Sequence, residues 1–240
     1  MNPTTLSRLV DLNRQFYQTF ALPFSTTRQR LQPGIKRILE QIGSQNNLLD
    51  LGCGNGELAR QLAGRVHMGA YTGLDFSPAL LAQASANQPA NFRFQQADLS
   101  STDWDASLQV ERYDAILAFA VLHHLPGMEA RLQVLRKVRS LLSATGCFFH
   151  SEWQFLNSPR LKARIQPWGT IGLSEDDVDP GDYLLDWRQG GQGLRYVHHF
   201  SRSELEELAE AVGFEVVENF LSDGENDRLG LYQVWRPCDL

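Results

Sequence analysis

The stretch Leu48-Leu49-Asp50-Leu51-Gly52-Cys53-Gly54-Asn55-Gly56-Glu57 decides the fold. It reads as an apolar strand that runs into three alternate glycines, after which a helix begins at once. Glycine suits this turn because a backbone without Cβ atoms can bend sharply and let a ligand come close. The free N–H groups at the start of the helix favour an anionic group there. A tight turn without any ligand is the alternative interpretation, and the flanking sequence separates the two.

Strand-like and helix-like segments alternate on the C-terminal side of this turn. The pattern predicts strands at 47–51, 71–75, 92–95, 113–119 and 146–150, and helices at 57–65, 78–86, 127–142 and 202–212. Two further strands, 214–220 and 230–235, flank a turn-rich segment and predict an antiparallel hairpin at the C-terminal edge of the sheet. We therefore expect an α/β, Rossmann-like fold with a seven-stranded, mostly parallel sheet and helices on both faces.

We expect residues 1–240 to form a single domain with two additions. A helix at 5–20, stopped by Pro23, and a second helix at 34–42 predict an N-terminal helical lid over residues 1–45. Residues 153–200 hold several prolines and glycines and an acidic run. This composition predicts an insertion over the edge of the sheet where the active site is expected.

Composition limits the classes of partner and compartment. The chain has 22 basic and 28 acidic residues and a formal charge of −6, whereas a protein that binds nucleic acid alone usually has a basic face. This balance favours a small acceptor, or a partner that supplies basic surface. The three cysteines contain no CxxC pair, so we expect neither a metal site nor a disulfide framework. We see no signal peptide and no apolar run long enough to cross a membrane, so we expect a cytoplasmic protein without membrane contact.

Acidic residues follow the next two predicted strands. Asp75 ends the second strand, about 20 residues after the glycines, where an acid meets ribose hydroxyls in dinucleotide-binding folds. Asp98 follows the third strand. The glycine spacing is G-x-G-x-G, whereas nicotinamide dehydrogenases use G-x-G-x-x-G to seat a pyrophosphate. S-adenosylmethionine has no phosphate but carries an ammonium and a sulfonium, so an acidic loop suits it better.

The series Asp50-x-Gly52-x-Gly54-x-Gly56, Asp75, Ala97-Asp98 and Tyr113-Asp114-Ala115-Ile116 resembles the class I methyltransferase family over roughly residues 30–150. The resemblance implies that S-adenosylmethionine is the cofactor. Asp75 would hold the ribose hydroxyls, Asp98 the adenine amino group, and the Gly52–Gly56 loop the methionyl part. Phe76 and Leu99 would flank the adenine. The expected cofactor-binding set is Asp50, Gly52, Cys53, Gly54, Gly56, Asp75, Phe76, Asp98, Leu99 and Phe119.

Three shorter motifs resemble the eukaryotic tRNA methyltransferase nine family. They are Phe24-Ser25-Thr26-Thr27-Arg28, the run Ala120-Val121-Leu122-His123-His124-Leu125, and Arg195-Tyr196-Val197-His198-His199-Phe200. The resemblance implies methylation of a carboxylate on the wobble uridine of tRNA, together with a small activator protein.

A carboxylate acceptor needs no general base, only a positive group that aligns it with the sulfonium. Arg28 could pair with it bidentately, and His123, His124 and His198 complete the expected catalytic set. Other interpretations stay open: Arg28 on the surface or on the methionyl carboxylate, and the paired histidines as a helix cap and a buried, hydrogen-bonded residue. A small-molecule methyltransferase and a non-catalytic subunit that binds S-adenosylmethionine are the alternative functions.

Overall fold

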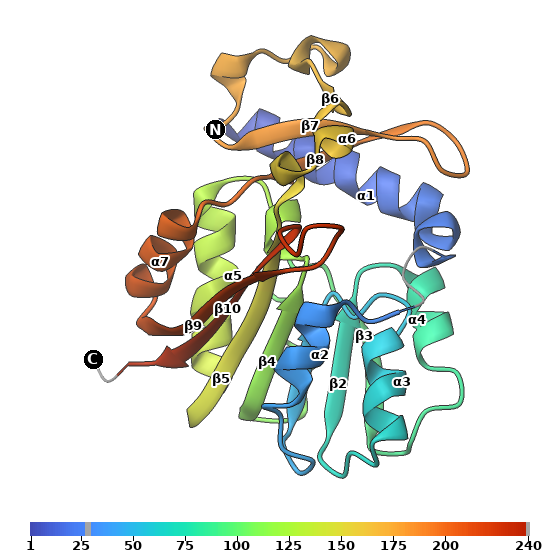
Figure 1. Ribbon diagram of the computed structural model, residues 1–240, viewed down its shortest axis with the longest axis vertical. Coiled ribbons are helices and arrows are strands. Elements are labelled where there is room, and N and C mark those ends of the chain that lie inside the picture. The colour runs from blue at the N-terminus through green and yellow to red at the C-terminus, as the bar shows by residue number, and fades with distance from the viewer. Residues whose placement is uncertain (27–29, 239–240) are drawn as a thin grey trace.

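A seven-stranded sheet forms the body of the computed structural model, which describes residues 1–26 and 30–238 without the side chains of Leu22 and Phe24 (Figure 1). The spatial order is β3-β2-β1-β4-β5-β10-β9. The strands are β1 Leu48–Leu51, β2 Tyr71–Asp75, β3 Phe92–Gln96, β4 Tyr113–Phe119, β5 Leu142–Trp153, β9 Phe214–Ser222 and β10 Gly230–Pro237. β1 to β5 are parallel, and β10 lies antiparallel between β5 and β9. The predicted fold class and the antiparallel C-terminal edge are therefore confirmed.

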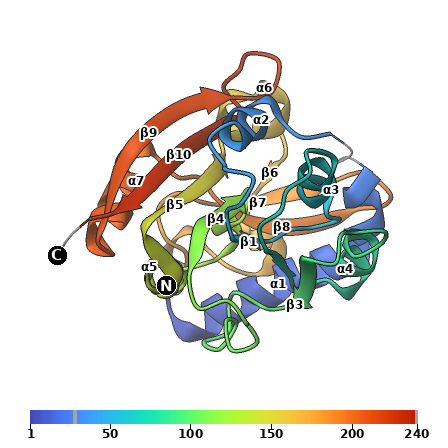
Figure 2. The same ribbon diagram turned by 90° about the horizontal axis from the view of Figure 1, so that it is seen from below.

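Helices cover both faces of the sheet, as the view from below shows (Figure 2). On one face, α2 Pro33–Leu39 and α3 Glu57–Gly64 bury their apolar side chains against β1, β2 and β4. On the other face, α5 Met128–Leu141 and α7 Arg202–Ala211 pack on β4, β5 and β10. α4 Pro78–Ala84 connects β2 to β3. All four residues of β1 are buried, which explains why this strand is a continuous apolar run broken only by Asp50.

Local sequence explains where the helices begin and end. Ser77 and Ser201 cap α4 and α7, since each side chain accepts a hydrogen bond from a backbone N–H of the first turn. Pro33 occupies the first turn of α2, where its missing N–H costs nothing. Gly213, with φ +76°, follows α7 and releases the chain into β9.

Two elements extend beyond their predicted bounds. The first helix, α1, spans Pro3–Thr26: it is broken at Phe20, where the prediction ended it and the backbone is non-helical, but helical residues then continue past Pro23. Pro23 cannot donate to the turn before it, and the helix absorbs this loss as a kink instead of ending. β5 is longer than predicted and continues to Trp153, because β10 pairs with it along this whole extension.

The segment after β5 forms a second sheet, which we call the small sheet. It consists of β6 Ile165–Gln166, β7 Asp182–Trp187 and β8 Gly193–His198, in antiparallel order β6-β7-β8. The short helix α6 Pro159–Lys162 and the 3-10 turns at 155–157, 168–171 and 175–177 precede β7. Figure 1 shows the small sheet beside α1, beyond the carboxyl ends of the parallel strands.

Candidate active site

A cavity of about 250 Å³ lies at the carboxyl ends of β1, β2 and β4, with α1 along its other side. The glycine loop, Gly52–Gly56, forms part of its wall. Gly54 has φ +56°, and no described atom lies within 4 Å of the place that a Cβ would take, so its backbone is open to a ligand. Gly56 does not line the cavity. A Cβ there would lie 2.7 Å from the Cα of Ala84, so this glycine lets α3 pack on α4.

Asp50 and Cys53 line the cavity at the end of β1. The Tyr71 hydroxyl donates to the Asp50 carboxylate at 2.6 Å. Burial raises the pKa of Asp50 to about 7, and the nearby charge of Asp75 adds to this effect. Burial also raises the pKa of the Cys53 thiol, which therefore stays protonated at neutral pH. The end of β1 thus offers one carboxylate, Asp50, whose ionisation can respond to a charge in the cavity.

Asp75 and Phe76 line the cavity where β2 ends. The Asp75 carboxylate accepts hydrogen bonds from the backbone N–H of Gly54 at 3.0 Å and of Ser77 at 2.9 Å. Burial raises the pKa of Asp75, although these N–H groups oppose the shift. Asp75 therefore ties the end of β2 to the glycine loop and fixes the shape of the cavity wall.

Asp98 and Leu99 line the cavity after β3, and Arg14 of α1 meets them there. The Arg14 guanidinium donates to the Asp98 carboxylate at 2.7 Å, and both side chains are partly exposed. Partial burial alone would raise the pKa of Asp98, but hydrogen bonds from Ser100 and Arg14 lower it below its usual value. Asp98 is thus ionised and links α1 to the body of the fold.

His124 and Phe119 line the cavity at the end of β4, and Tyr17 of α1 lies opposite. The Tyr17 hydroxyl is 2.6 Å from Nε2 of His124, with the two rings nearly perpendicular. Asn13, one turn before Tyr17, donates to the backbone carbonyl of His124 at 3.0 Å. Side chains of α1 thus hold both the ring and the main chain of His124.

His123 points away from the cavity lining. Its Nδ1 lies 2.8 Å from the Glu152 carboxylate, which also accepts the His123 backbone N–H and contacts Nδ1 of His150 at 3.2 Å. Burial raises the pKa of Glu152 well above its usual value and lowers that of His150 to about 3. His123 therefore resembles the alternative interpretation given above for one of the two histidines, a buried and hydrogen-bonded residue.

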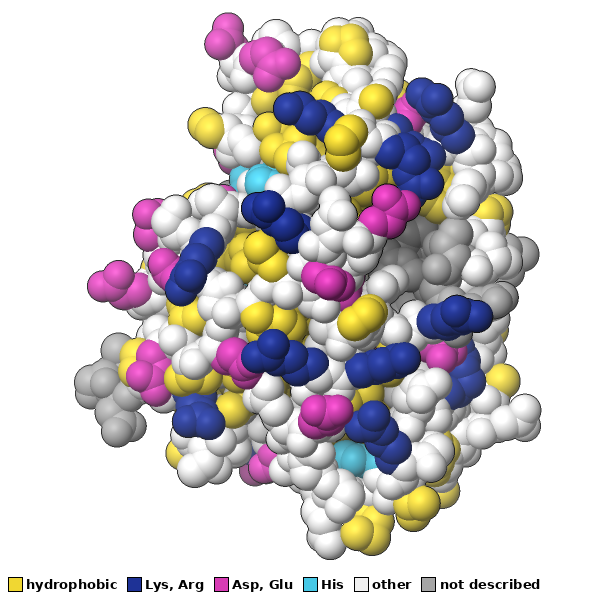
Figure 3. Space-filling model, viewed as in Figure 1, with side chains coloured by type: hydrophobic (Ala, Val, Ile, Leu, Met, Phe, Trp, Pro, Cys, Tyr) yellow, Lys and Arg dark blue, Asp and Glu magenta, His cyan; other side chains and the backbone are white. Residues whose placement is uncertain are grey.

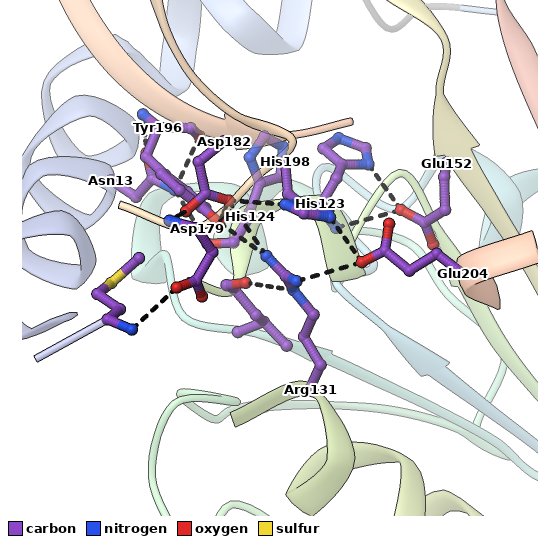
Figure 4. A network of polar contacts seen from close by, with 12 residues as sticks. Asn13, His123, His124, Arg131, Glu152, Asp179, Asp182, Tyr196, His198 and Glu204 are labelled. Atoms are coloured by element: carbon purple, nitrogen blue, oxygen red, sulfur yellow. Dashed lines mark hydrogen bonds and ion pairs between the residues drawn. The ribbon is translucent and has the colours of Figure 1, made fainter. Parts of the chain in front are cut away.

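His198 lies in a second buried network, shown in Figure 4, and does not line the cavity. Its two ring nitrogens lie 2.7 Å from the Asp182 carboxylate and 2.8 Å from that of Glu204. Arg131 lies 3.5 Å from the former carboxylate and 3.7 Å from the latter. This network joins the small sheet to α5 and α7, and Figure 4 shows His123 and His124 beside it, but His198 itself does not reach the cavity lining.

Arg28 lies outside the described residues. Sequence reasoning missed three of the α1 side chains that line the cavity, Asn13, Arg14 and Tyr17. They lie three and four positions apart on the polar side of the predicted helix at 5–20, and this spacing could have indicated them.

The residues of the cavity fit S-adenosylmethionine. The open backbone at Gly54 and the acidic Asp50 suit a group that carries an ammonium and a sulfonium. Asp75 and Asp98 offer acceptors for hydroxyl and amino groups, and Phe76 and Leu99 offer apolar surface to a flat base. In the described part of the chain, no cluster of His, Cys, Asp and Glu could hold a metal ion, and no helix is long and apolar enough to cross a membrane.

Comparisons with known proteins bear on the cofactor and the fold. A family model described as a methyltransferase domain matches residues 24–219. The chain is 26% identical over 226 residues to the tRNA (carboxymethyluridine(34)-5-O)-methyltransferase of Schizosaccharomyces pombe, covering 85% of this chain and 89% of that protein.

Two solved structures have a similar fold, each with a TM-score of 0.67. One is the 1,6-didemethyltoxoflavin-N1-methyltransferase of Burkholderia thailandensis with bound S-adenosylhomocysteine, which is 20% identical over 100% of this chain and 92% of that one. The other is the chain in complex with the Trm112 methyltransferase activator of Haloferax volcanii, which is 14% identical over 97% of this chain and 98% of that one. At these identities the likeness shows the fold alone.

Proposed function

The chain belongs to the methyltransferase domain family and is an S-adenosylmethionine-dependent methyltransferase, and we propose that it methylates a carboxylate oxygen of its acceptor. The proposal rests on the distribution of acidic side chains around the cavity. All four carboxylates among its described lining residues come from α3 and from the ends of β1, β2 and β3; they are Asp50, Glu57, Asp75 and Asp98. The side formed by Tyr17, His124 and the segment after β4 has no described carboxylate, so an anionic acceptor is not repelled there.

The reaction needs alignment more than proton transfer. S-adenosylmethionine supplies an electrophilic methyl group on a sulfonium, and a carboxylate oxygen can attack it without losing a proton. The new C–O bond forms as the S–CH3 bond breaks, and the bonding electron pair stays on sulfur. Tyr17 and His124 can offer hydrogen bonds to the acceptor, while Phe119, Val121 and Leu125 exclude water.

The relative from S. pombe supports a wobble-uridine acceptor, because its match spans most of both chains. The charge distribution supports help from a second protein. Figure 3 shows Lys and Arg side chains interspersed with Asp and Glu over the described surface of the viewed face, and the whole chain carries −6. A basic activator would add phosphate contacts to this mixed surface. Free small carboxylates are the second candidate acceptor.

The test is methyl transfer from labelled S-adenosylmethionine to three acceptors, each with and without an activator of the Trm112 type. The acceptors are an anticodon stem-loop RNA with 5-carboxymethyluridine, the free nucleoside, and the same RNA with the neutral amide. We expect label on the carboxylate forms only, and its release as methanol in mild alkali, because the product is a methyl ester. Transfer to the amide, or label that resists alkali, would contradict a carboxylate acceptor. Cofactor binding without turnover on any acceptor would favour a non-catalytic subunit.

A further inference from the structure

Arg195 of β8 is a buried arginine without an acidic partner in the described part of the chain. It is 7% exposed, and its Nε is buried with no hydrogen-bond acceptor there. Three aromatic rings surround the guanidinium carbon, which lies 4.7 Å from the ring centroid of Trp153, 5.4 Å from Phe16 and 5.7 Å from Trp187. The guanidinium is thus surrounded by aromatic rings, while its Nε–H has no acceptor among the described residues.

Arg131 is a second buried arginine, and its guanidinium, unlike that of Arg195, has polar partners in the fold. Arg131 donates to the backbone carbonyl of Leu125 at 3.0 Å and to the Tyr196 hydroxyl at 2.8 Å, and it lies near the carboxylates of Asp182 and Glu204. A buried cation is expensive without such partners. Cation–π contacts offset part of this cost for Arg195 but leave its buried Nε–H without an acceptor among the described residues.

The position of Arg195 relates it to the acceptor side of the cavity. The Trp153 ring is 6.4 Å from that of His123, which is 4.3 Å from that of His124. On the other side, the Phe16 ring is 5.0 Å from that of Tyr17. Arg195 does not line the cavity itself, but these ring contacts connect it, through Phe16 on one side and Trp153 and His123 on the other, to Tyr17 and His124, which do.

We propose that Arg195, with the rings of Phe16, Trp153 and Trp187, forms an anion subsite that binds the carboxylate of the methyl acceptor. The planar guanidinium edge matches a carboxylate, and the rings give a flat acceptor a surface on which to stack. This inference rests on the proposed carboxylate acceptor and adds the residue that selects it. It also explains why a charged side chain stays buried without an acid beside it.

The test compares Arg195→Met and Arg195→Lys with a matched control, Arg188→Met. Arg188 belongs to the connection between β7 and β8, but it is exposed and paired with Asp186. Each protein, loaded with S-adenosylhomocysteine, is titrated calorimetrically with 5-carboxymethyluridine and with its neutral amide. We expect the wild type to prefer the carboxylate and Arg195→Met to bind it at least about tenfold more weakly, with amide affinity unchanged. Arg188→Met should match the wild type.

Two results would overturn the assignment: a wild type that does not prefer the carboxylate, or an Arg195→Met variant that loses carboxylate and amide affinity equally. The second would mean that Arg195 only supports the aromatic cluster.

If Arg195→Met does not fold, Arg195→Lys keeps the charge, and a raised KM for the acceptor with unchanged cofactor affinity supports the subsite. Carboxylate binding through Arg195 without methyl transfer would reject the proposed function alone. Equal turnover of a carboxylate by wild type and Arg195→Met would reject the subsite alone.

Discussion

Burial makes the Asp50 carboxylate partly ionised and partly protonated near physiological pH. Its pKa is raised to about 7, first by burial and then by the charge of Asp75, while the Tyr71 hydroxyl opposes the shift. A bound cation favours the ionised form. Because Asp50 is mostly neutral at pH 6 and mostly ionised at pH 8, cofactor affinity should rise by up to about tenfold over this range. Calorimetric titration with S-adenosylmethionine measures the slope. Asp50→Asn should bind more weakly and with a flatter pH profile, and an unchanged slope in this variant would assign the titration to another group.

Gly54 and Gly56 allow a binding effect to be separated from a folding effect. Both have positive φ, so alanine at either position costs about 1–2 kcal/mol in backbone strain. At Gly56 the added Cβ also meets the backbone of Ala84, whereas at Gly54 it meets no described atom within 4 Å. Gly56→Ala should therefore lower the free energy of unfolding more than Gly54→Ala.

Gly54→Ala should lose more cofactor affinity, by at least about tenfold, since its Cβ stands where the ligand approaches. Urea unfolding and calorimetry of both variants measure this, and the reverse order would mean that Gly56 forms the binding surface.

At the scale of single elements, Asn13 connects α1 to β8 and to the turn that carries His124. Its side chain donates to the carbonyls of His124 and Tyr196 and accepts the Tyr196 N–H at 2.8 Å, and Asn13 is buried. Three lost hydrogen bonds should lower the free energy of unfolding of Asn13→Ala by about 2–3 kcal/mol. If His124 acts in methyl transfer, kcat should fall more than cofactor affinity, because the turn is no longer held in place. Asn157→Ala, which removes one exposed hydrogen bond to Arg228, is the control. Equal losses of kcat in Asn13→Ala and Asn157→Ala would contradict a role of Asn13 in positioning His124.

The same element shows what sequence could and could not predict. β1, the glycine loop and the acids after β2 and β3 were predictable, because strand ends and turns are encoded by neighbouring residues. The placement of Asn13, Glu152 and Arg195 was not, since each depends on partners far away in the sequence. His198 was grouped with His124 by motif, yet packing of the small sheet on α5 and α7 directs it into the network of Asp182 and Glu204. Local patterns thus predict the sheet and its loop, whereas the wall opposite them is set by tertiary packing.

For the molecule as a whole, α1 both contributes side chains to the cavity and packs on the small sheet. Of its links across the cavity, the partly exposed pair Arg14–Asp98 is worth at most about 1 kcal/mol, whereas Asn13 and Tyr17 also hydrogen-bond to His124. We expect α1 to be a lid that cofactor binding stabilises. Hydrogen–deuterium exchange should therefore slow at the amides of residues 10–21 when S-adenosylhomocysteine binds, while α7, which is remote from the cavity, should not change. Arg14→Ala should exchange faster in this segment without cofactor. Equal protection of α1 in the free and bound protein would mean that it is a fixed wall, and the acceptor would then have to enter from the side of the small sheet.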